Sequence, residues 1–300
     1  MAPKVWVVTG ANSGIGLALV QHVLSQGDKV IATVRSMAKF TDGLKGAEPL
    51  ILDLSGPDYE IRKAGEAALK IYGHVDVVVN NAGFGVIAPV EELEMDDVRK
   101  QFQTNVFGAI AFTQAFLPHF RARKTGHILN VTSIGAFNNL PHWGAYSASK
   151  AALDAFSESL SYEVEPYNIR VLAIMPGYFS TKFFGASPSV GKLSTIYTDP
   201  KQGYNTLEAI PKRHVETKQI GDPVKLGQRV YDVVHGTGMA KGLVESQGGK
   251  RGWMRVPLGP DCGEPMLAKL NTVKENVDVF EKIWRSTDVE PEQLKFYPDG

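Results

Sequence analysis

Three glycines lie close together near the start of the chain, directly after an apolar run, and no other feature restricts the fold as strongly. Residues 4–9 (KVWVVT) are nearly all apolar, which predicts a buried parallel strand. Gly10, Gly14 and Gly16 follow at once, and from Leu17 onward apolar residues recur at helical spacing. A glycine turn between a strand and a helix can hold a pyrophosphate, because its N–H groups and the helix dipole favour an anion there. A glycine cluster alone is more often a plain turn, so the remaining motifs decide between the two.

Further apolar runs alternate with helical patterns along the chain. They cover residues 29–34, 49–54, 75–80, 127–132, 169–175 and 252–258. Strands that alternate with helices form βαβ units, whose right-handed crossovers put helices on both faces of a parallel sheet. We therefore expect an α/β fold, a doubly wound parallel sheet of about seven strands, with a ligand crevice at the carboxyl ends of the strands. The segments that follow strands and should meet at that edge are residues 10–16, 80–83, 133 and 176–177.

A tyrosine and a lysine stand four residues apart in residues 145–165, a segment with a helical pattern. Residues i and i+4 lie on one face of a helix, so Tyr146 and Lys150 should point the same way. A tyrosine with a pKa of ~10 needs ~4 kcal/mol of charge stabilisation to ionise near neutral pH, and one ammonium at ~4 Å supplies that at an effective dielectric of ~20. Tyr146 would then act as a general acid or base, with Ser133 hydrogen bonded to the substrate oxygen. Taken singly, these residues are equally typical of a solvated surface pair and a loop serine.

Six short segments together resemble one protein family. They are residues 9–16 (TGANSGIG), 80–83 (NNAG), 105–108 (NVFG), 131–133 (VTS), 146–150 (YSASK) and 176–181 (PGYFST). In this order and at these intervals they resemble the short-chain dehydrogenase/reductases of the non-extended type, strongly over residues 4–181 and weakly over 222–259. The resemblance implies a Rossmann-like fold and an NAD(P)-dependent ketoreductase that interconverts a carbonyl and a secondary alcohol by hydride transfer. The catalytic residues that it implies are Asn105, Ser133, Tyr146 and Lys150, with a water held by Asn105 between Lys150 and solvent.

The resemblance also implies which residues hold the dinucleotide. These are Thr9, Gly10, Asn12, Ser13, Gly14, Ile15, Gly16, Arg35, Asp53, Leu54, Asn80, Ala82, Gly83, Tyr146, Lys150, Pro176, Gly177 and Thr181. Val34 stands where relatives that use NAD have an acid, and Arg35 follows it, as in relatives that bind the 2′-phosphate of NADP. We therefore favour NADP(H) over NAD(H); the alternative is that Arg35 is a plain surface residue. Asp53 resembles the family's adenine-side contact, and its alternative role is to cap a helix that begins near Pro57.

Residues 178–221 form a long insertion rich in aromatic residues, glycine and proline, and we expect this segment to be a substrate lid. The residues expected to contact substrate are Phe137, His142, Trp143, Tyr178, Phe183 and Phe184. Pockets lined by such side chains bind apolar ligands, so we expect an apolar or ring-bearing carbonyl or alcohol, similar to a steroid, a retinoid or a polyketide. The alternative is that these aromatic residues only pack the lid onto the domain.

Length, charge and cysteine content restrict the remaining classes of protein. A chain of 300 residues buries enough surface for one large domain, and we expect residues 1–300 to form it. The 32 basic and 32 acidic residues balance, which removes the electrostatic footprint of a nucleic-acid-binding protein. The chain has one cysteine, and it has no apolar run of ~18–20 residues that could span a membrane. The first predicted strand begins at residue 4, which leaves no room for a signal peptide, so we expect a cytoplasmic protein without a membrane span. The seven histidines show no metal-ligand spacing, so no metal is expected.

The C-terminal part adds two helices, and two other functions stay open. Asp222 should cap a helix that runs from Pro223 to about His235. Residues 264–284 predict a helix with an apolar stripe suited to the core or to a subunit interface, so a homo-oligomer is possible. A cofactor-binding sensor or scaffold should lack the serine, tyrosine and lysine that this chain has. An epimerase or dehydratase could use the same tyrosine, but such enzymes belong mostly to the extended relatives, whose glycine motif has a different spacing.

Overall fold

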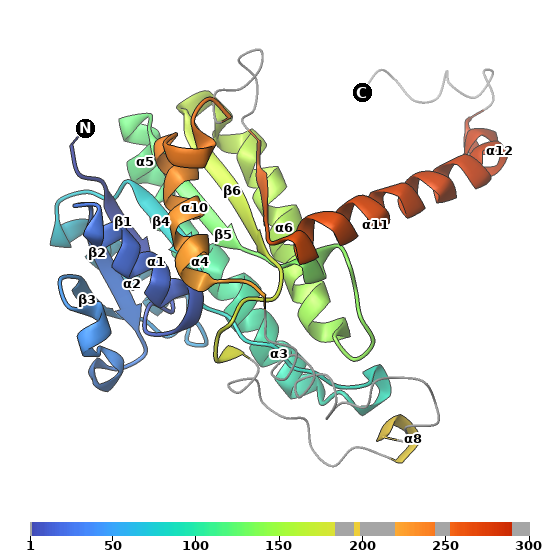
Figure 1. Ribbon diagram of the computed structural model, residues 1–300, viewed down its shortest axis with the longest axis horizontal. Helices are drawn as coiled ribbons and strands as arrows, with labels where there is room; N and C mark the ends of the chain where they lie inside the picture. Colours follow the sequence, from blue (N-terminus) through green and yellow to red (C-terminus); the bar gives the residue numbers. More distant parts are fainter. Residues whose placement is uncertain (1, 184–194, 199–219, 244–252, 290–300) are drawn as a thin grey trace.

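The computed structural model describes residues 2–183, 195–198, 220–243 and 253–289. The predicted lid at residues 178–221 lies mostly outside these ranges, and so does Phe184. Within them, seven parallel strands form one sheet in the order β3-β2-β1-β4-β5-β6-β7 (Figure 1). The strands are β1 (Val5–Val8), β2 (Lys29–Val34), β3 (Glu48–Ile51), β4 (Val77–Asn80), β5 (Gly126–Val131), β6 (Ile169–Pro176) and β7 (Arg255–Leu258).

The strand order confirms the predicted doubly wound, Rossmann-like topology. The chain runs outward from β1 to β3, returns to β4 on the other side of β1, and continues outward to β7. The direction of winding therefore reverses between β1 and β4, which is where such folds bind ligands. Four strands are shorter than predicted, namely β1, β3, β4 and β7. Strand β3 ends at Ile51 because its neighbour β2 ends at Val34, the last residue with which it pairs, and β7 begins only at Arg255.

Helices connect the strands and extend beyond the last one. They are α1 (Gly14–Ser25), α2 (Asp58–Ile71), α3 (Met95–Phe102), α4 (Gly108–Gln114), α5 (Leu117–Arg123), α6 (Gly144–Val164), α8 (Thr195–Thr198), α10 (Pro223–His235), α11 (Pro260–Val279) and α12 (Glu281–Trp284). Short 3₁₀ segments cover Met37–Lys39, Asp42–Leu44, Val90–Glu92, Ile134–Ala136, Glu165–Tyr167, Gly238–Ala240 and Arg285–Thr287. The Asp222 carboxylate accepts a hydrogen bond from the Val224 N–H at 2.8 Å, so the predicted cap of α10 is present.

Two apolar layers cover the two faces of the sheet. Trp6 and Val8 of β1 point into the layer that lies under α1 and α10. Val5 and Val7, which alternate with them, point into the layer under α2, α4, α5 and α6. Because successive strand residues face opposite sides, a central parallel strand needs apolar residues throughout, and residues 4–9 meet this requirement.

The C-terminal helix departs from its prediction. It begins at Pro260, four residues before the predicted start, and breaks at Phe280, after which α12 follows. Figure 1 shows α11 projecting away from the sheet. Its apolar stripe is exposed, so the expectation that the stripe belongs to the core is wrong, whereas a role at a subunit interface stays a prediction. Within the described ranges no helix has both the length and the apolar character needed to cross a bilayer.

Candidate active site

A cleft of about 940 Å³ opens at the carboxyl ends of the central strands. Its lining comes from the turn after β1, the ends of β2 and β3, and the segments after β4, β5 and β6. The sheet thus brings together the segments that the sequence predicted to meet. The predicted site residues that line the cleft are Thr9, Gly10, Asn12, Ser13, Gly14, Ile15, Arg35, Asp53, Leu54, Ala82, Gly83, Ser133, Trp143, Tyr146, Lys150, Pro176, Gly177, Tyr178, Thr181 and Phe183.

The glycine turn is so tight that side chains would not fit in it. Gly10 and Gly14 have φ angles of +63° and +54°, in the region that favours glycine. A Cβ on Gly16 would lie 2.5 Å from the Gly10 carbonyl oxygen. Gly16 does not line the cleft itself, so its role is to let helix α1 start directly against the turn.

The start of α1 fits the pyrophosphate of a dinucleotide. Ser13 is the N-cap residue, but its side chain makes no capping hydrogen bond, and the first turn contains no acidic residue. The N–H groups and the positive end of the helix dipole are therefore left to an anion from the cleft. Gly14 and Ile15, the first two helical residues, both line that cleft.

Thr9 fastens the turn to the end of β4. Its Oγ1 accepts hydrogen bonds from the N–H groups of Asn81 and Ala82, at 2.9 and 3.0 Å. Asn81 Nδ2 donates in return to the Thr9 carbonyl oxygen at 2.9 Å. Side-chain hydrogen bonds thus join the ends of β1 and β4, the two strands between which the winding reverses.

Arg35 and Asp53 mark the end of the cleft beside β2 and β3. Asp53 Oδ1 accepts hydrogen bonds from Ser55, at 2.9 Å from the N–H and 2.7 Å from the hydroxyl. Burial by itself raises the pKa of Asp53, but the bonds from Ser55 and the charge of Arg35 together hold it below its usual value. The alternative role of Asp53 as a helix cap is not observed, because the N-cap residue of α2 is Pro57.

Tyr146, Lys150 and Ser133 meet in the middle of the cleft. The first two lie one turn apart on α6, as their spacing predicted, and Ser133 follows β5. Lys150 Nζ lies 5.9 Å from the centre of the Tyr146 ring and donates to the Val131 carbonyl oxygen at 2.7 Å. The side chains of Ser133 and Tyr146 interact through a hydrogen bond. Hydroxyl, phenol and amine are therefore collected within one small region.

Burial dominates the ionisation of this group. It raises the pKa of Tyr146 to about 12, and the hydrogen bond with Ser133 offsets only part of that effect. Burial also lowers the pKa of Lys150 to about 8. Desolvation favours the neutral form of both groups, so the expectation that Lys150 alone brings the pKa of Tyr146 near neutrality is wrong for the protein by itself.

Asn105 lies beside this group but does not line the cleft. It belongs to a π-helical segment, Gln103–Phe107, between α3 and α4, and such segments are frequent at functional sites. Its Nδ2 donates to the Phe84 carbonyl oxygen at 2.9 Å and to Ser149 Oγ at 3.0 Å. A Cβ on Gly83 would lie 2.9 Å from Asn105 Oδ1 and 3.4 Å from Lys150 Nζ, so a larger residue there would displace the Asn105 side chain.

Aromatic side chains form one side of the cleft. The rings of Trp143 and Phe183 lie edge-on to the Tyr146 ring, with centroids 5.3 and 5.6 Å away. Ile87 packs into the same cluster. Two other predicted substrate residues do not line the cleft: Phe137 lies under the Arg255 guanidinium at 5.4 Å, and His142 faces Tyr197 at 6.0 Å.

Asn80 is another predicted residue that does not line the cleft. It is buried, and its Nδ2 donates to Thr113 Oγ1 at 2.8 Å and to Asn130 Oδ1 at 2.7 Å. These bonds join β4 to α4 and β5, so the contacts of Asn80 are internal to the fold. Its neighbour Asn81, which the sequence analysis did not name as a site residue, lines the cleft instead.

Asp261, in the first turn of α11, holds the loop after β6. Its Oδ2 accepts a hydrogen bond from the Tyr178 N–H at 2.6 Å, and a Cβ on Gly177 would lie 2.3 Å from its Oδ1. Within the described part of the chain that Oδ1 is buried without a hydrogen-bond partner. No pattern in the sequence indicated this contact, because the two residues are far apart along the chain.

Of the remaining cleft residues, some lie inside the sequence motifs and others lie where no motif indicates a site. They are Thr33, Val34, Leu52, Ser55, Phe84, Lys100, Thr104, Val131, Thr132, Ile134, Gly135, Asn138, Leu140, Ser147, Phe179 and Lys182. Thr132 and Ser147 stand inside motifs that were already recognised, so the motif boundaries could have included them. Lys100 and Thr104 come from α3 and the π-helical segment, where no strand end pointed to the cleft.

Comparison with known proteins gives consistent matches. Residues 4–189 match the family model described as short chain dehydrogenase. "Oxidoreductase BOA17" of Botryotinia fuckeliana is 31% identical over 266 residues, which cover 87% of this chain and 90% of that protein. A "3-ketodihydrosphingosine reductase" of Bacteroides thetaiotaomicron is 36% identical over 235 residues, covering 78% of this chain and 84% of that protein.

Solved structures agree with the sequence matches. A short-chain dehydrogenase from Streptomyces avermitilis superimposes with a TM-score of 0.81 and 32% identity, over 96% of this chain and 99% of that one. Two more distant enzymes share the fold and were solved with cofactor. The one from Burkholderia cenocepacia J2315 holds NADP (TM-score 0.68, 22% identity, 92% and 96% coverage), and the one from Burkholderia phymatum holds NAD (0.73, 20%, 92% and 95%).

Proposed function

The chain belongs to the short-chain dehydrogenase family and is an NAD(P)-dependent oxidoreductase, and from this premise we propose that it interconverts a carbonyl and a secondary alcohol with Tyr146 as the proton carrier. One observation supports the proposal most strongly. Tyr146, Lys150 and Ser133 line the same cleft as the glycine turn, so a proton donor and a dinucleotide site share one cavity. The residues of that turn fit the pyrophosphate, as their tight backbone and open helix start indicate.

Each residue has a separate task in the proposed reaction. A reduced nicotinamide supplies the hydride when it is bound, and the oxidised form accepts one. In the reductive direction the Tyr146 hydroxyl gives its proton to the carbonyl oxygen while the new C–H bond forms at the carbonyl carbon. Ser133 hydrogen-bonds the same oxygen and keeps it beside the phenol. In the oxidative direction the tyrosinate takes the proton back from the alcohol.

The pKa of Tyr146 suits the acid role in the protein by itself. A phenol with a pKa of about 12 is fully protonated at neutral pH, so a proton is available for reduction. Oxidation needs the tyrosinate, and the positive charges of Lys150 and of an oxidised nicotinamide would stabilise it. We keep for Asn105 the role of holding a water between Lys150 and solvent, since both residues border Gly83.

Arg35 supports the choice of NADP(H). It is exposed, lines the cleft at the end of β2, and follows the apolar Val34 rather than an acid. Its guanidinium can pair with a 2′-phosphate, which an NAD molecule lacks. Asp53 is nearby, but its oxygen Oδ1 is already engaged by Ser55.

The aromatic side of the cleft supports an apolar or ring-bearing substrate. Trp143 and Phe183 flank the Tyr146 ring, and both line the same cleft. Leu140 and Phe179 add apolar surface to the same cleft. A 36% identical relative is named for the reduction of a ketone, in agreement with this direction of chemistry.

The proposal is tested with ketones of increasing ring number, by following the absorbance of the reduced nicotinamide. NADPH should show a lower KM than NADH, and ring-bearing ketones should be preferred to small polar sugars. Tyr146→Phe should lower kcat by roughly 10²- to 10⁴-fold, because it removes only the proton carrier. Tyr167→Phe is the matched control, since Tyr167 lies on the surface outside the cleft.

Binding separates loss of chemistry from loss of folding. Tyr146→Phe should bind NADPH, measured by nucleotide fluorescence, within a few fold of wild type. Full turnover by Tyr146→Phe would refute the assigned role. Equal KM values for NADH and NADPH would refute the cofactor preference without touching the proposed reaction.

A further inference from the structure

The loop after β6 is held from two sides where it passes the cleft. Gly177 and Tyr178 of this loop both line the cleft. On one side the Gly177 N–H donates to the Leu258 carbonyl oxygen at 2.9 Å, at the end of β7. On the other side the Gly221 N–H donates to the Tyr178 carbonyl oxygen at 3.0 Å, just before α10 begins. The C-terminal part of the chain therefore fixes the backbone of this part of the cleft wall.

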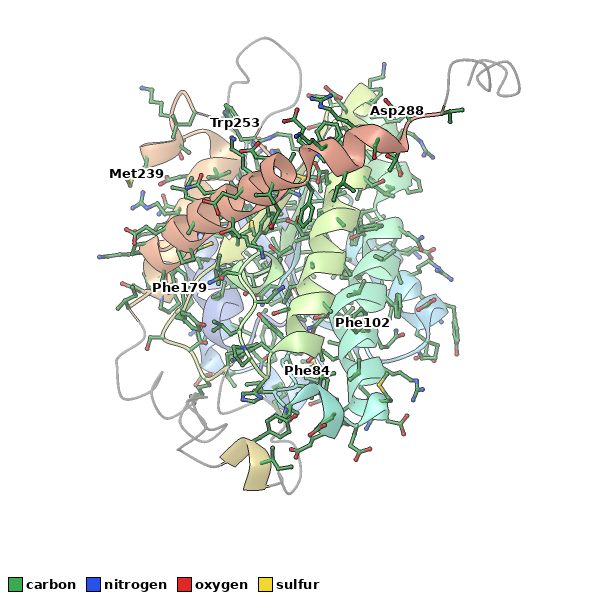
Figure 2. The ribbon with its side chains drawn as sticks, turned by 90° about the vertical axis from the view of Figure 1, so that its right-hand side faces the viewer. Phe84, Phe102, Phe179, Met239, Trp253 and Asp288 are labelled. Atoms are coloured by element: carbon green, nitrogen blue, oxygen red, sulfur yellow. The ribbon has the colours of Figure 1, made fainter. Side chains whose placement is uncertain are left out.

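One side chain, the carboxylate of Asp261 in the first turn of α11, completes this hold. Its Oδ2 accepts a hydrogen bond from the Tyr178 N–H at 2.6 Å. Its Oδ1 lies where a Cβ on either Gly177 or Gly259 would overlap it. Figure 2 shows the loop residue Phe179 near the first turns of α11. Two glycines thus leave room for one carboxylate directly behind the cleft wall.

A carboxylate is a costly group with which to bind one backbone N–H. Within the described part of the chain, Asp261 Oδ1 is buried and has no hydrogen-bond partner. Burying a charged group that is incompletely paired lowers stability, and a neutral oxygen could accept the same bond from the Tyr178 N–H. Stability alone therefore does not account for a carboxylate at this position.

Tyr178, whose backbone Asp261 holds, lies close to the proposed proton carrier. Burial, opposed by the hydrogen bond with Ser133 and supported by the nearby Tyr178, raises the pKa of Tyr146 to about 12. One phenol influences the pKa of another in this way only when the two are near each other. Burial and the charge of Asp261 both raise the pKa of Tyr178 itself, so its ring borders the cleft as a neutral phenol.

We propose that Asp261 is a positioning residue for the reaction, because it fixes the backbone of Tyr178 so that the Tyr178 ring contacts the substrate beside Tyr146. The inference rests on the proposed function and adds to it a residue from the C-terminal helix. Without the carboxylate, the Tyr178 N–H loses its acceptor and the loop after β6 can shift. A shift of ~1 Å in a group that positions substrate can cost up to ~10²-fold in rate.

Steady-state reduction of a ring-bearing ketone tests the proposal. Asp261→Ala should raise the KM for the ketone about 10-fold and lower kcat by less, because it displaces a substrate contact and leaves the proton carrier in place. Asp261→Asn keeps an oxygen that can accept from the Tyr178 N–H, so its KM should return to within about 3-fold of wild type. A KM as high in Asp261→Asn as in Asp261→Ala would overturn the proposal, because the hydrogen bond would then not be what matters.

Asp76→Ala is the matched control for a loss of stability. The Asp76 carboxylate also accepts a hydrogen bond from a backbone N–H, that of Val5 at 2.8 Å, but at the amino end of β1 and outside the cleft. This variant should unfold at a lower temperature than wild type and keep the wild-type KM. A rise in KM equal to that of Asp261→Ala would overturn the proposal, because destabilisation alone would then account for both.

A double-mutant cycle tests whether Asp261 acts through Tyr178. In a Tyr178→Ala chain, the further change Asp261→Ala should raise the KM by less than about 2-fold, because the contact that it positions is already gone. Equal effects of Asp261→Ala with and without the Tyr178 ring would overturn the proposal. Tyr146→Phe keeps the two failures apart. Full turnover by Tyr146→Phe would refute the proposed reaction, whereas lost turnover together with a wild-type KM in Asp261→Ala would refute only the role of Asp261.

Discussion

At the scale of single residues, one physical effect acts in opposite senses on the two titrating groups of the cleft. Tyr146 and Lys150 are both buried, and burial favours the uncharged form of each. For the phenol this means a raised pKa, and for the amine a lowered one. Lys150 Nζ donates a hydrogen bond to the Val131 carbonyl oxygen at 2.7 Å. The buried amine therefore has a cost for folding that depends on pH.

The first prediction follows from the pKa of Lys150, which is about 8 in the folded protein against 10.5 for the free side chain. Between these values the unfolded chain binds the proton and the folded chain does not, so stability rises with pH in that window. The free energy of unfolding of wild type should gain about 1.4 kcal/mol per pH unit there relative to Lys150→Met. Urea unfolding without cofactor at pH 7.5, 8.5 and 9.5 measures the difference.

The unfolding measurements stay below pH 10 because Tyr146 also titrates above that pH. Tyr146 has a raised pKa, so its contribution to stability is present below pH 10 and is lost between pH 10 and about 12. Below pH 10 the difference in unfolding free energy between wild type and Lys150→Met therefore reports the titration of Lys150 alone. Parallel stability curves for wild type and Lys150→Met would show that the buried amine keeps its proton throughout.

At the scale of elements, the join between β1 and α1 is built on backbone-to-backbone contact. Gly16 lies within α1, but a Cβ there would be 2.5 Å from both the Gly10 carbonyl oxygen and Asn81 Nδ2. A helix normally gains stability when glycine is replaced by alanine. Here the gain is outweighed, because a backbone oxygen has no freedom to move aside.

The second prediction compares two helical glycines. Gly16→Ala should weaken NADPH binding at least 10-fold, because the start of α1 must move away from the turn. Gly263→Ala, in α11, has no atom within 4 Å of the added Cβ and should bind NADPH as wild type does, with stability unchanged or raised by up to ~1 kcal/mol. Fluorescence titration and thermal unfolding provide the two readouts. Wild-type affinity in Gly16→Ala would contradict the tight-turn account.

The loop after β6 shows how an element outside the cleft takes part in it. Asp261 stands at the start of α11 and fixes the Tyr178 N–H, while Gly177 leaves room for its carboxylate. Pro176, Gly177 and Tyr178 line the cleft. The projecting helix is thus anchored at the same place that shapes the site.

At the scale of the whole molecule, the sheet separates two apolar layers. The cleft lies at the ends of the strands that these two layers hold in place. In the layer under α4 and α5, the rings of Phe112, Phe116 and Phe120 follow one another at 5.1 and 6.2 Å. A Cβ on Gly126 would lie 2.4 Å from Phe120 Cγ, so the start of β5 is packed directly against this ring. Strand β5 then leads to Ser133, which ties the core to the site.

The third prediction compares two phenylalanines of different burial. Phe120→Ala should lower the free energy of unfolding by about 3–5 kcal/mol, because it leaves a cavity between α5 and β5. Phe107→Ala removes a side chain that is 53% exposed and should cost less than ~1 kcal/mol. Denaturant unfolding at equilibrium measures both. Equal losses would mean that the Phe120 layer does not contribute to stability as described.

The sequence by itself determined the topology and most of the cleft, because both depend on local patterns. Apolar runs with glycine turns specify strands followed by helices, and parallel winding then collects the strand ends at one edge. This is why Tyr146, Ser133 and the glycine turn could be placed in one site from their positions along the chain. The spacing of Tyr146 and Lys150 likewise specified one helix face.

Only the tertiary structure decided what depends on neighbours distant in sequence. It turned Asn80 inward and Asn81 toward the cleft, brought Asp261 to Tyr178, and left the stripe of α11 exposed in the part of the chain that the structure describes. It also decided that burial outweighs charge at Tyr146, since desolvation depends on everything packed around the ring. Periodicity says which face of a helix is apolar, but the rest of the fold determines whether that face is buried.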